Sequence, residues 1–245
     1  MSRHATDPLE PEFTQAAKPY GRRAFLGIAA LGSLGVLIGN GYASTVKVTV
    51  GKVAPDAAAQ LLPLNDQRWT IFTVTDGYPV RSQADYRLTV SGLVDRPLDL
   101  SYSELLKRKQ TKMTKDFQCV TGWRVDEVPW VGVLLKDLLD EAGVQAGAAA
   151  IRFTSFDGAY TESLTIEQAQ RPDMLVAYKL LGRDISTEHG GPVRLYAAPM
   201  YGYKSIKWLE NIEVVDRVVP GYWEERGYDV DAWVGSSNGL NDEPT

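Results

Sequence analysis

The stretch FQCVTGWR, residues 117–124, contains Cys119, the single cysteine of this 245-residue chain. A disulfide needs two cysteines, so Cys119 forms no bridge within the chain. Its side chain is therefore a buried small apolar group, a nucleophile or a metal ligand. The pattern of residues 115–120 predicts a strand, and the Thr-Gly pair after the cysteine predicts a turn. The stretch thus places one thiol at the end of a strand, where a bulky ligand can approach the backbone.

Strand patterns outnumber helix patterns along the rest of the chain. Apolar alternation and short apolar runs predict strands at residues 86–91, 151–156, 174–178, 193–197 and 206–215. Short helices are predicted at residues 101–107, which begin with a Ser-x-x-Glu capping box, at residues 134–142, which Gly143 ends, and after Thr165. Because strands and helices do not alternate regularly, the sequence predicts an α+β fold of mixed β-sheets with short helices.

The first 43 residues predict an export signal rather than part of the folded domain. The paired arginines at positions 22 and 23 precede Phe-Leu and the uncharged residues 24–38, a pattern typical of twin-arginine signal peptides. The alternative is an uncleaved N-terminal anchor, because residues 24–46 carry no charge and are long enough to cross a bilayer. Residues 44–245 are then expected to form one domain with an aromatic C-terminal tail.

Charge and motif content restrict the partners of this domain. The chain has 26 Lys and Arg against 31 Asp and Glu, a net charge of −5 at pH 7, which argues against nucleic acid as a partner. The sequence contains no Cys-x-x-Cys-His haem motif, no set of iron–sulfur cysteines and no GxGxxG fingerprint. Any redox chemistry at Cys119 therefore requires electrons from, or to, a separate protein.

A second block rich in hydrogen-bond donors is HGGPVRL, residues 189–195, followed by YGYKSIKW, residues 201–208. Arg194 offers a bidentate fork and Lys204 and Lys207 offer point charges, while a Gly-Tyr-Lys-Ser turn exposes backbone N–H groups. Such donors suit a phosphate group. Taken singly, each of these cations would be a solvated surface charge, so the prediction depends on the block as a whole.

Together the two blocks resemble the sulfite oxidase-like molybdopterin oxidoreductases, over about residues 70–228. The resemblance points to the small bacterial branch that includes periplasmic methionine-sulfoxide reductases. It implies the sulfite oxidase-like molybdopterin-binding fold, Mo-molybdopterin as cofactor and the Cys119 thiolate as a ligand of the metal. Carried across residue by residue, it implies these cofactor contacts: Thr154, His189, Arg194, Lys204, Ser205, Ile206 and Lys207. His189 departs from the Asn found in relatives.

Two residues beside the cysteine have alternative interpretations. Trp123 would form a wall of the metal site, or it packs in the core. Arg124 would supply positive charge as a catalytic residue, or it forms a surface salt bridge.

The resemblance further implies an exported enzyme, in the periplasm or on the outer face of the membrane, that performs two-electron oxygen-atom transfer on a small oxidised or oxidisable substrate. Its redox partner would be a membrane cytochrome or a quinone-linked subunit. The Cys-x-Gly-Asn-Arg-Arg pattern of classical sulfite oxidases is replaced here by CVTGWR, which favours S-oxide or N-oxide reduction over sulfite oxidation. Two alternatives remain: a cysteine hydrolase with Cys119 as nucleophile and His189 as base, and a non-catalytic exported domain that retains the fold.

Overall fold

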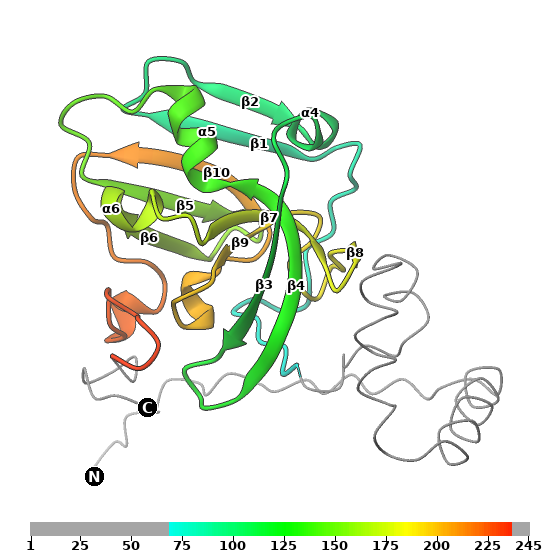
Figure 1. Ribbon diagram of the computed structural model, residues 1–245. Coiled ribbons are helices and arrows are strands. Elements are labelled where there is room, and N and C mark those ends of the chain that lie inside the picture. Colours follow the sequence, from blue (N-terminus) through cyan, green and yellow to red (C-terminus); the bar gives the residue numbers. More distant parts are fainter. Residues whose placement is uncertain (1–68, 237–245) are drawn as a thin grey trace, which may run out of the picture. The chain divides into compact units, whose positions relative to one another are not determined.

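Two β-sheets carry the part of the chain that the computed structural model describes, residues 69–236 (Figure 1). The strand order of the first sheet is β2–β1–β10–β5–β6. These strands are β1 Arg87–Gly92, β2 Leu98–Ser101, β5 Ala150–Ser155, β6 Thr161–Thr165 and β10 Leu209–Val215. The pair β1–β10 is parallel and the other pairs are antiparallel.

The second sheet positions the cysteine. It consists of β3 Thr111–Gln118, β4 Arg124–Leu134, β7 Met174–Leu180, β8 Arg183–Asp184 and β9 Arg194–Ala197. All its pairs are antiparallel, in the order β3–β4–β7–β8 with β9 also paired to β7. Strands β3 and β4 form a long hairpin that extends past the first sheet in Figure 1. Residues 119–123 are its turn, so Cys119 lies at the tip of this hairpin.

Short helices connect the strands where local capping signals predict them. Helix α4 is Tyr102–Leu106, α5 is Leu135–Ala142 and α6 is Ile166–Ala169. Capping boxes begin α4 and α6, and Gly143 ends α5 with a φ of 73°. Helix α5 buries Leu135, Leu138, Leu139 and Ala142 in the main core, and each buried leucine contributes about 1.5–3 kcal/mol. The predicted α+β class with mixed sheets and short helices is confirmed.

Several segments differ from the strands that the sequence predicts: β3 begins earlier, at Thr111, and β2, β4, β6 and β8 were not predicted. The strand expected over residues 206–215 begins only at Leu209, because Trp208 adopts a φ of 53°, which a strand does not allow. The eleven-residue strand β4 was not expected; it contains Pro129, and its Glu127 has a φ of 50°. Proline cannot donate to a sheet ladder and weakens a strand pattern.

The chain after β10 lies across the domain as far as residue 236. The Tyr222 N–H donates to Thr161 O over 3.0 Å, and the Tyr222 ring stacks on Tyr160 with centroids 5.7 Å apart. Ala232 is buried, and Trp233 forms an isolated β-bridge with Met200. This segment includes the short 3-10 helix η3, Glu224–Arg226. We refer to residues 221–236 as the tail.

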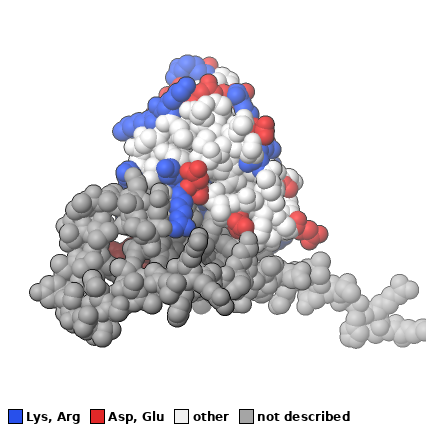
Figure 2. All heavy atoms as spheres, turned by 90° about the vertical axis from the view of Figure 1, so that its right-hand side faces the viewer, with Lys and Arg blue, Asp and Glu red and all other residues white. Residues whose placement is uncertain are grey.

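The predicted leader, residues 1–43, lies outside the described residues. Within residues 69–236, no helix is long and apolar enough to span a membrane. The face seen in Figure 2 carries Lys and Arg side chains next to Asp and Glu over its described part. Charges of both signs are therefore neighbours on this face.

Candidate cofactor site

Cys119 lies in a tight turn that leaves its thiol accessible. The Cys119 N–H donates to Trp123 O over 2.9 Å, and the Gly122 N–H donates to Cys119 O over 3.1 Å. Gly122 has a φ of 94° and no atom within 4 Å of the place a Cβ would take, so the turn borders open space. The Thr121 hydroxyl donates to Cys119 Sγ over 3.2 Å, and the cysteine is partly exposed. The thiolate is the form of cysteine that binds a metal.

An aromatic wall stands beside this turn. The ring of Trp69 lies 5.9 Å from that of Trp123 and 5.1 Å from that of His189, and Phe117 stacks against Trp123. The indole N–H groups of Trp69 and Trp123 are buried and have no acceptor among residues 69–236. Buried donors normally find a partner. An acceptor-rich ligand would supply one.

Arg194, the first residue of β9, is a buried cation with no carboxylate bound to it among the described residues. Its guanidinium donates to His189 O over 2.7 Å, to Ser205 O over 2.6 Å and to Leu195 O over 3.3 Å. It also lies over the Phe117 ring, 5.5 Å from the centroid. Burial lowers the pKa of Arg194 to about 10. The group remains charged at neutral pH and would gain from an anion nearby.

Lys207 is a second cation of the same neighbourhood. Its Nζ donates to Phe72 O over 2.5 Å and to Glu188 O over 3.3 Å, and lies 4.2 Å from the centre of the Trp208 ring. Burial, and next the charge of Arg194, lower the pKa of Lys207 from 10.5 to about 7, while Asp157 and Glu188 partly oppose this. Two cations that destabilise each other define a place for an anion.

A glycine fixes this arrangement. Gly190 has a φ of 95°, and a Cβ there would lie 2.6 Å from the Cβ of Lys207. The His-Gly-Gly segment therefore packs directly on the lysine, which only glycine allows.

Three of the other predicted contacts are Ser205 and Ile206, which bind β9, and Thr154, which lies on β5. Ser205 is buried, and its Oγ accepts the Ala197 N–H over 3.0 Å while its carbonyl binds Arg194. Ile206 lies in the core, and its carbonyl accepts the Leu195 N–H over 2.9 Å. His189, Arg194, Ser205 and Lys207 are thus brought together. Thr154 is half-buried on β5 of the first sheet, in register with Asn211 and Thr161.

The Lys204 side chain differs from the expectation that it contacts a cofactor phosphate. Its ammonium is fully buried and donates to Glu162 Oε1 over 2.6 Å, to Ser163 O over 2.7 Å and to Glu224 Oε1. An ammonium has three donors, and all three are used. Burial works to lower the pKa of Lys204, but the two carboxylates outweigh it and raise that pKa.

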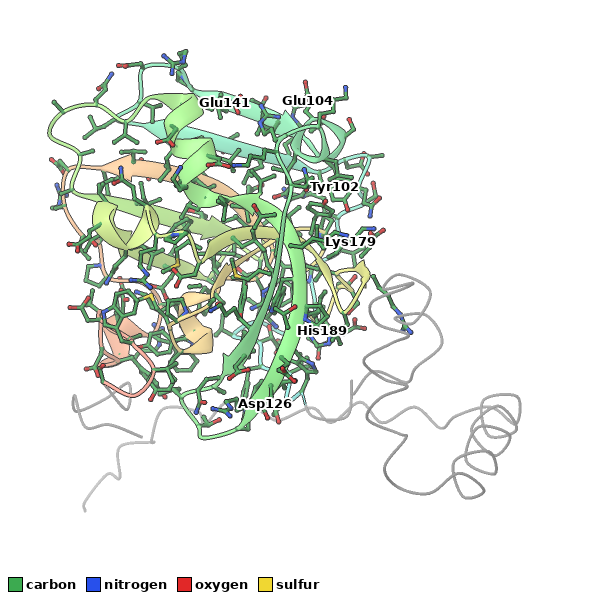
Figure 3. The ribbon with its side chains drawn as sticks, in the orientation of Figure 1. Tyr102, Glu104, Asp126, Glu141, Lys179 and His189 are labelled. Atoms are coloured by element: carbon green, nitrogen blue, oxygen red, sulfur yellow. The ribbon has the colours of Figure 1, made fainter. Side chains whose placement is uncertain are left out.

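Arg124, the first residue of β4, lies at the surface. Its Nε donates to Asp126 Oδ1 over 2.6 Å and its NH1 is 3.9 Å from Asp116 Oδ2, with half of the side chain exposed. This matches the surface salt bridge that the sequence left open. Figure 3 labels Asp126 and His189 in the lower part of the molecule, away from Glu104 and Glu141 at the top.

Tyr228 of the tail is a candidate site residue that the sequence analysis did not name. Burial raises the pKa of Tyr228, and the charge of Cys119 raises it further, so the phenol lies within electrostatic reach of the thiol. Its ring contacts Tyr203 with centroids 5.5 Å apart and Trp223 with centroids 5.2 Å apart. More than one hundred residues separate Tyr228 from Cys119. No local pattern could have linked them.

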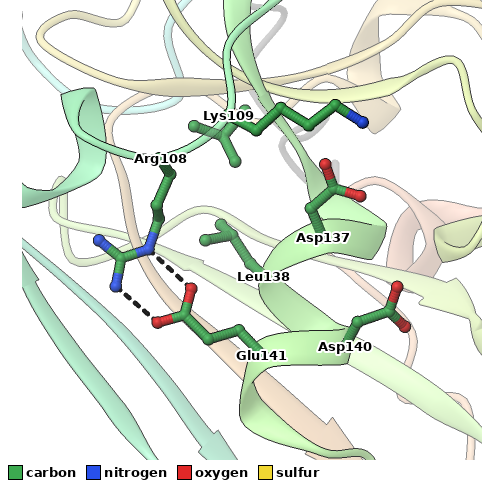
Figure 4. A pocket seen from close by; sticks show the side chains of 7 residues that line it. Arg108, Lys109, Asp137, Leu138, Asp140 and Glu141 are labelled. Carbon is green, nitrogen blue, oxygen red and sulfur yellow. Dashed lines mark hydrogen bonds and ion pairs between the residues drawn. The ribbon is translucent and has the colours of Figure 1, made fainter.

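A surface hollow of about 350 Å³ lies elsewhere, beside α5 (Figure 4). It is lined by Arg108, Lys109, Val133, Asp137, Leu138, Asp140 and Glu141. Arg108 and Glu141 form a two-point ion pair across it, at 2.7 and 2.8 Å. It adjoins the Thr111 end of β3, and Cys119 follows the other end, roughly 23 Å of strand away. This hollow is therefore separate from the candidate site.

The class of protein follows from comparison with known proteins. The chain belongs to the family with the oxidoreductase molybdopterin binding domain, which it matches over residues 75–223. It is 34% identical to the uncharacterized oxidoreductase YuiH of Bacillus subtilis over 172 residues, 65% of this chain and 86% of YuiH. The resemblance stated from the sequence is confirmed, and so is membership in a molybdopterin-dependent oxidoreductase family.

Other relatives are longer than the matched region. Identity is 29% to the MsrP protein-methionine-sulfoxide reductase catalytic subunit of Campylobacter jejuni, over 57% of this chain and 52% of MsrP. It is 27% to Arabidopsis thaliana sulfite oxidase, over 58% and 45%. The fold resembles the sulfane dehydrogenase SoxCD of Paracoccus pantotrophus, with a TM-score of 0.54 and 22% identity over 64% of this chain and 50% of that one. The chain spans about half the length of these three relatives.

Proposed function

We propose that the chain binds Mo-molybdopterin, with Cys119 as the protein ligand of the metal, and reduces an S-oxide or N-oxide by two-electron oxygen-atom transfer. The observation that carries this proposal is the pair Arg194 and Lys207: a buried guanidinium without a carboxylate, next to an ammonium with a depressed pKa. An anion would stabilise both cations, and the terminal phosphate of the pterin is an anion of this kind. The unpaired indole N–H groups of Trp69 and Trp123 fit an acceptor-rich ring system.

When bound, the cofactor supplies a redox-active metal that exchanges two electrons and an oxygen atom with the substrate. The chain's own residues bind and enclose it. Cys119 offers a soft thiolate ligand. Trp69 and Trp123 exclude water from that side of the thiol. Tyr228, whose pKa is raised, keeps its proton at neutral pH and can donate a hydrogen bond to substrate oxygen near Cys119.

The proposed reaction requires an electron donor. Reduction of an S-oxide to a thioether consumes two electrons and two protons and releases one water. The sequence has one cysteine and no second redox motif, so we propose that a membrane cytochrome or quinone-linked subunit supplies the electrons. MsrP is named a catalytic subunit, which supports this arrangement. Sulfite oxidation at the same site is the runner-up, supported by the similarity to sulfite oxidase.

The substitution Cys119→Ser tests the proposal. Chain matured in a host that makes the cofactor should contain about one molybdenum per chain, and the variant should lose the thiolate-to-metal absorption band and turnover of dimethyl sulfoxide with a dye donor, because an alkoxide is a harder ligand. Thr121→Val is the matched control: it removes the bond to Sγ but keeps the ligand. A Cys119→Ser variant with unchanged spectrum and turnover would refute the proposal. Rapid sulfite oxidation without sulfoxide reduction would instead establish the runner-up.

We further propose that the chain is exported through the twin-arginine route, in which the arginine pair at positions 22 and 23 is the recognised feature. Replacing both arginines with lysines keeps the charge and should leave cofactor-loaded precursor in the cytoplasm. Fractionation of cells and immunoblotting measure this directly. Normal export of the double lysine variant would contradict the assignment.

A further inference from the structure

A buried cluster of three charged groups joins the tail to the domain. Glu162 comes from β6, Lys204 from the 3-10 helix η2 (Gly202–Lys204) and Glu224 from η3 in the tail, and all three are buried. The ammonium bonds both carboxylates. Glu224 also accepts the Gly221 N–H over 2.6 Å. Two carboxylates share one ammonium, so the fully ionised cluster carries one unbalanced negative charge out of water.

A proton bound to one of the two carboxylates removes this unbalanced negative charge. Burial raises the pKa of Glu162 from 4.5 to about 8; the charge of Lys204 opposes the rise and that of Glu224 adds to it. Glu162 Oε2 is buried and has no partner, whereas Oε1 accepts from Lys204 and from the Ser163 N–H. The other titratable groups that face the cluster are the phenols of Tyr160 and Tyr203, whose pKa values burial also raises. Both phenols are uncharged at neutral pH.

The cluster is connected to the cysteine turn through η2. Gly202 packs on Phe117, since a Cβ at that glycine would lie 2.6 Å from the Phe117 ring. The Tyr203 hydroxyl donates to Asp229 O over 2.6 Å, and its ring contacts Tyr228. Helix η2 therefore contacts β3, which ends one residue before Cys119, and also Tyr228 and Asp229 of the tail.

We propose that Glu162, Lys204 and Glu224 are positioning residues that form a proton-dependent clamp, which holds the tail and its Tyr228 against the Cys119 turn. With one proton on Glu162 the cluster is neutral and the clamp is closed. When that proton leaves, the two carboxylates repel each other across one ammonium and Glu224 is the mobile member, because its neighbours Glu225, Arg226 and Gly227 are exposed. The tail then loosens while the sheets remain folded.

The sign of the pH dependence follows from linkage. Between pH 4.5 and about 8 the closed tail holds a proton on Glu162 that an opened, solvated Glu162 would release. Closure is therefore strongest below pH 4.5, weakens as pH rises through this window, and reaches its lowest value above about pH 8. The clamp belongs to the chain itself, so it can be tested without turnover.

Hydrogen exchange of the full chain tests the clamp. Protection factors, corrected for intrinsic exchange, should fall at least about tenfold between pH 6 and pH 9 for tail amides such as that of Tyr222, because those amides exchange by local opening. Amides of β5 should change little. In Glu162→Gln the amide side chain keeps the oxygen that accepts from Lys204 and cannot ionise, so tail protection should be retained at pH 9.

Glu225→Gln is the matched control, because this exposed carboxylate lies next to Glu224 and outside the cluster. It should lose tail protection at pH 9 as the unmodified chain does. Should Glu162→Gln not fold, Glu224→Gln makes the same test, since one carboxylate then faces one ammonium at every pH. An equal loss of protection in the unmodified chain and in the Gln variant, or no loss in the unmodified chain, would overturn the proposal. Because no readout uses the cofactor, failure here is distinct from failure of the Cys119→Ser test.

Discussion

Lys204 and Lys207 lie three residues apart in the same block, yet their ammonium groups have opposite surroundings. Lys204 binds two buried carboxylates, and its pKa is raised. Within the described part of the chain Lys207 donates to backbone carbonyls alone; it lies near the Arg194 charge and has a pKa lowered to about 7. The first cation is neutralised by buried carboxylates, and the second is the one that we propose binds a ligand. The partners of a charged side chain, and not its place in a motif, decide its role.

The largest difference between the two lysines should appear in stability. Lys204→Met leaves Glu162 and Glu224 buried without their cation, so we expect the free energy of unfolding to fall by about 3–5 kcal/mol. Lys207→Met is the matched control and should cost much less at pH 7, because it removes a cation that no carboxylate balances. Urea denaturation at pH 7 measures both. Equal losses would show that the two surroundings do not differ as described.

Retention of the cofactor should depend on Arg194, the buried cation near Lys207. In Arg194→Lys a single ammonium cannot bind His189 O and Ser205 O at once and also meet an anion. We expect the affinity for the cofactor to fall by about 1.5–3 kcal/mol, roughly 10- to 150-fold. Molybdenum and pterin contents of purified protein are the measurements. Arg217→Lys, an exposed arginine that pairs with Asp216, is the control and should retain both. Full cofactor content in Arg194→Lys would remove the main support for the proposed site.

The pH dependence of Lys207 sharpens the comparison further. Its pKa falls from 10.5 in the unfolded chain to about 7 in the folded one, so between these values the unfolded chain binds more protons. Stability of the cofactor-free protein should therefore gain from Lys207 as pH rises above 7, and lose as pH falls through 7. The difference in unfolding free energy between the unmodified chain and Lys207→Met isolates this contribution, because Glu162 titrates in both. A difference that does not vary between pH 6 and pH 9 would contradict the assignment.

The smallest effect is expected for Arg124. Its ion pair with Asp126 is half exposed, and such pairs contribute about 0–1 kcal/mol. Arg124→Ala should change the denaturation midpoint little and leave the molybdenum content unchanged. Steady-state kinetics of the same variant then decide its role. A large loss of kcat at full metal content would support the catalytic role that the family resemblance implies.

Local signals in the sequence predicted much of the fold. The capping box at Ser101 and Glu104 and the glycine at position 143 mark helix ends, because each satisfies backbone groups within a few residues. Strand β4 was not predicted, because Pro129 breaks the pattern and the strand is stabilised by its two neighbours β3 and β7. That stabilisation is tertiary and leaves no periodic signal.

The residues of the candidate site also divide into those that a local sequence signal indicates and those that only tertiary contacts bring in. Cys119, Arg194 and Lys207 could be proposed from motifs, because their chemistry is carried by residue type and order. The use of Lys204 by Glu162 and Glu224 could not be predicted, since those carboxylates lie 42 and 20 residues away and meet the lysine only in the folded chain. Tyr228 was missed for the same reason. Both omissions concern the tail, whose contacts with the rest of the domain join residues distant in sequence.

The parallel pairing of β1 with β10 also limits the order in which the domain can fold during synthesis. The last strand of the first sheet, β10, lies in its centre, between β1 and β5. While the chain is being synthesised, the β1–β2 and β5–β6 hairpins therefore expose edges that cannot join until residues 209–215 have left the ribosome. Folding must wait for almost the complete chain, and the high sequence separation of these contacts makes it slow. A chain truncated before β10 is expected to aggregate through the two open edges rather than fold in part.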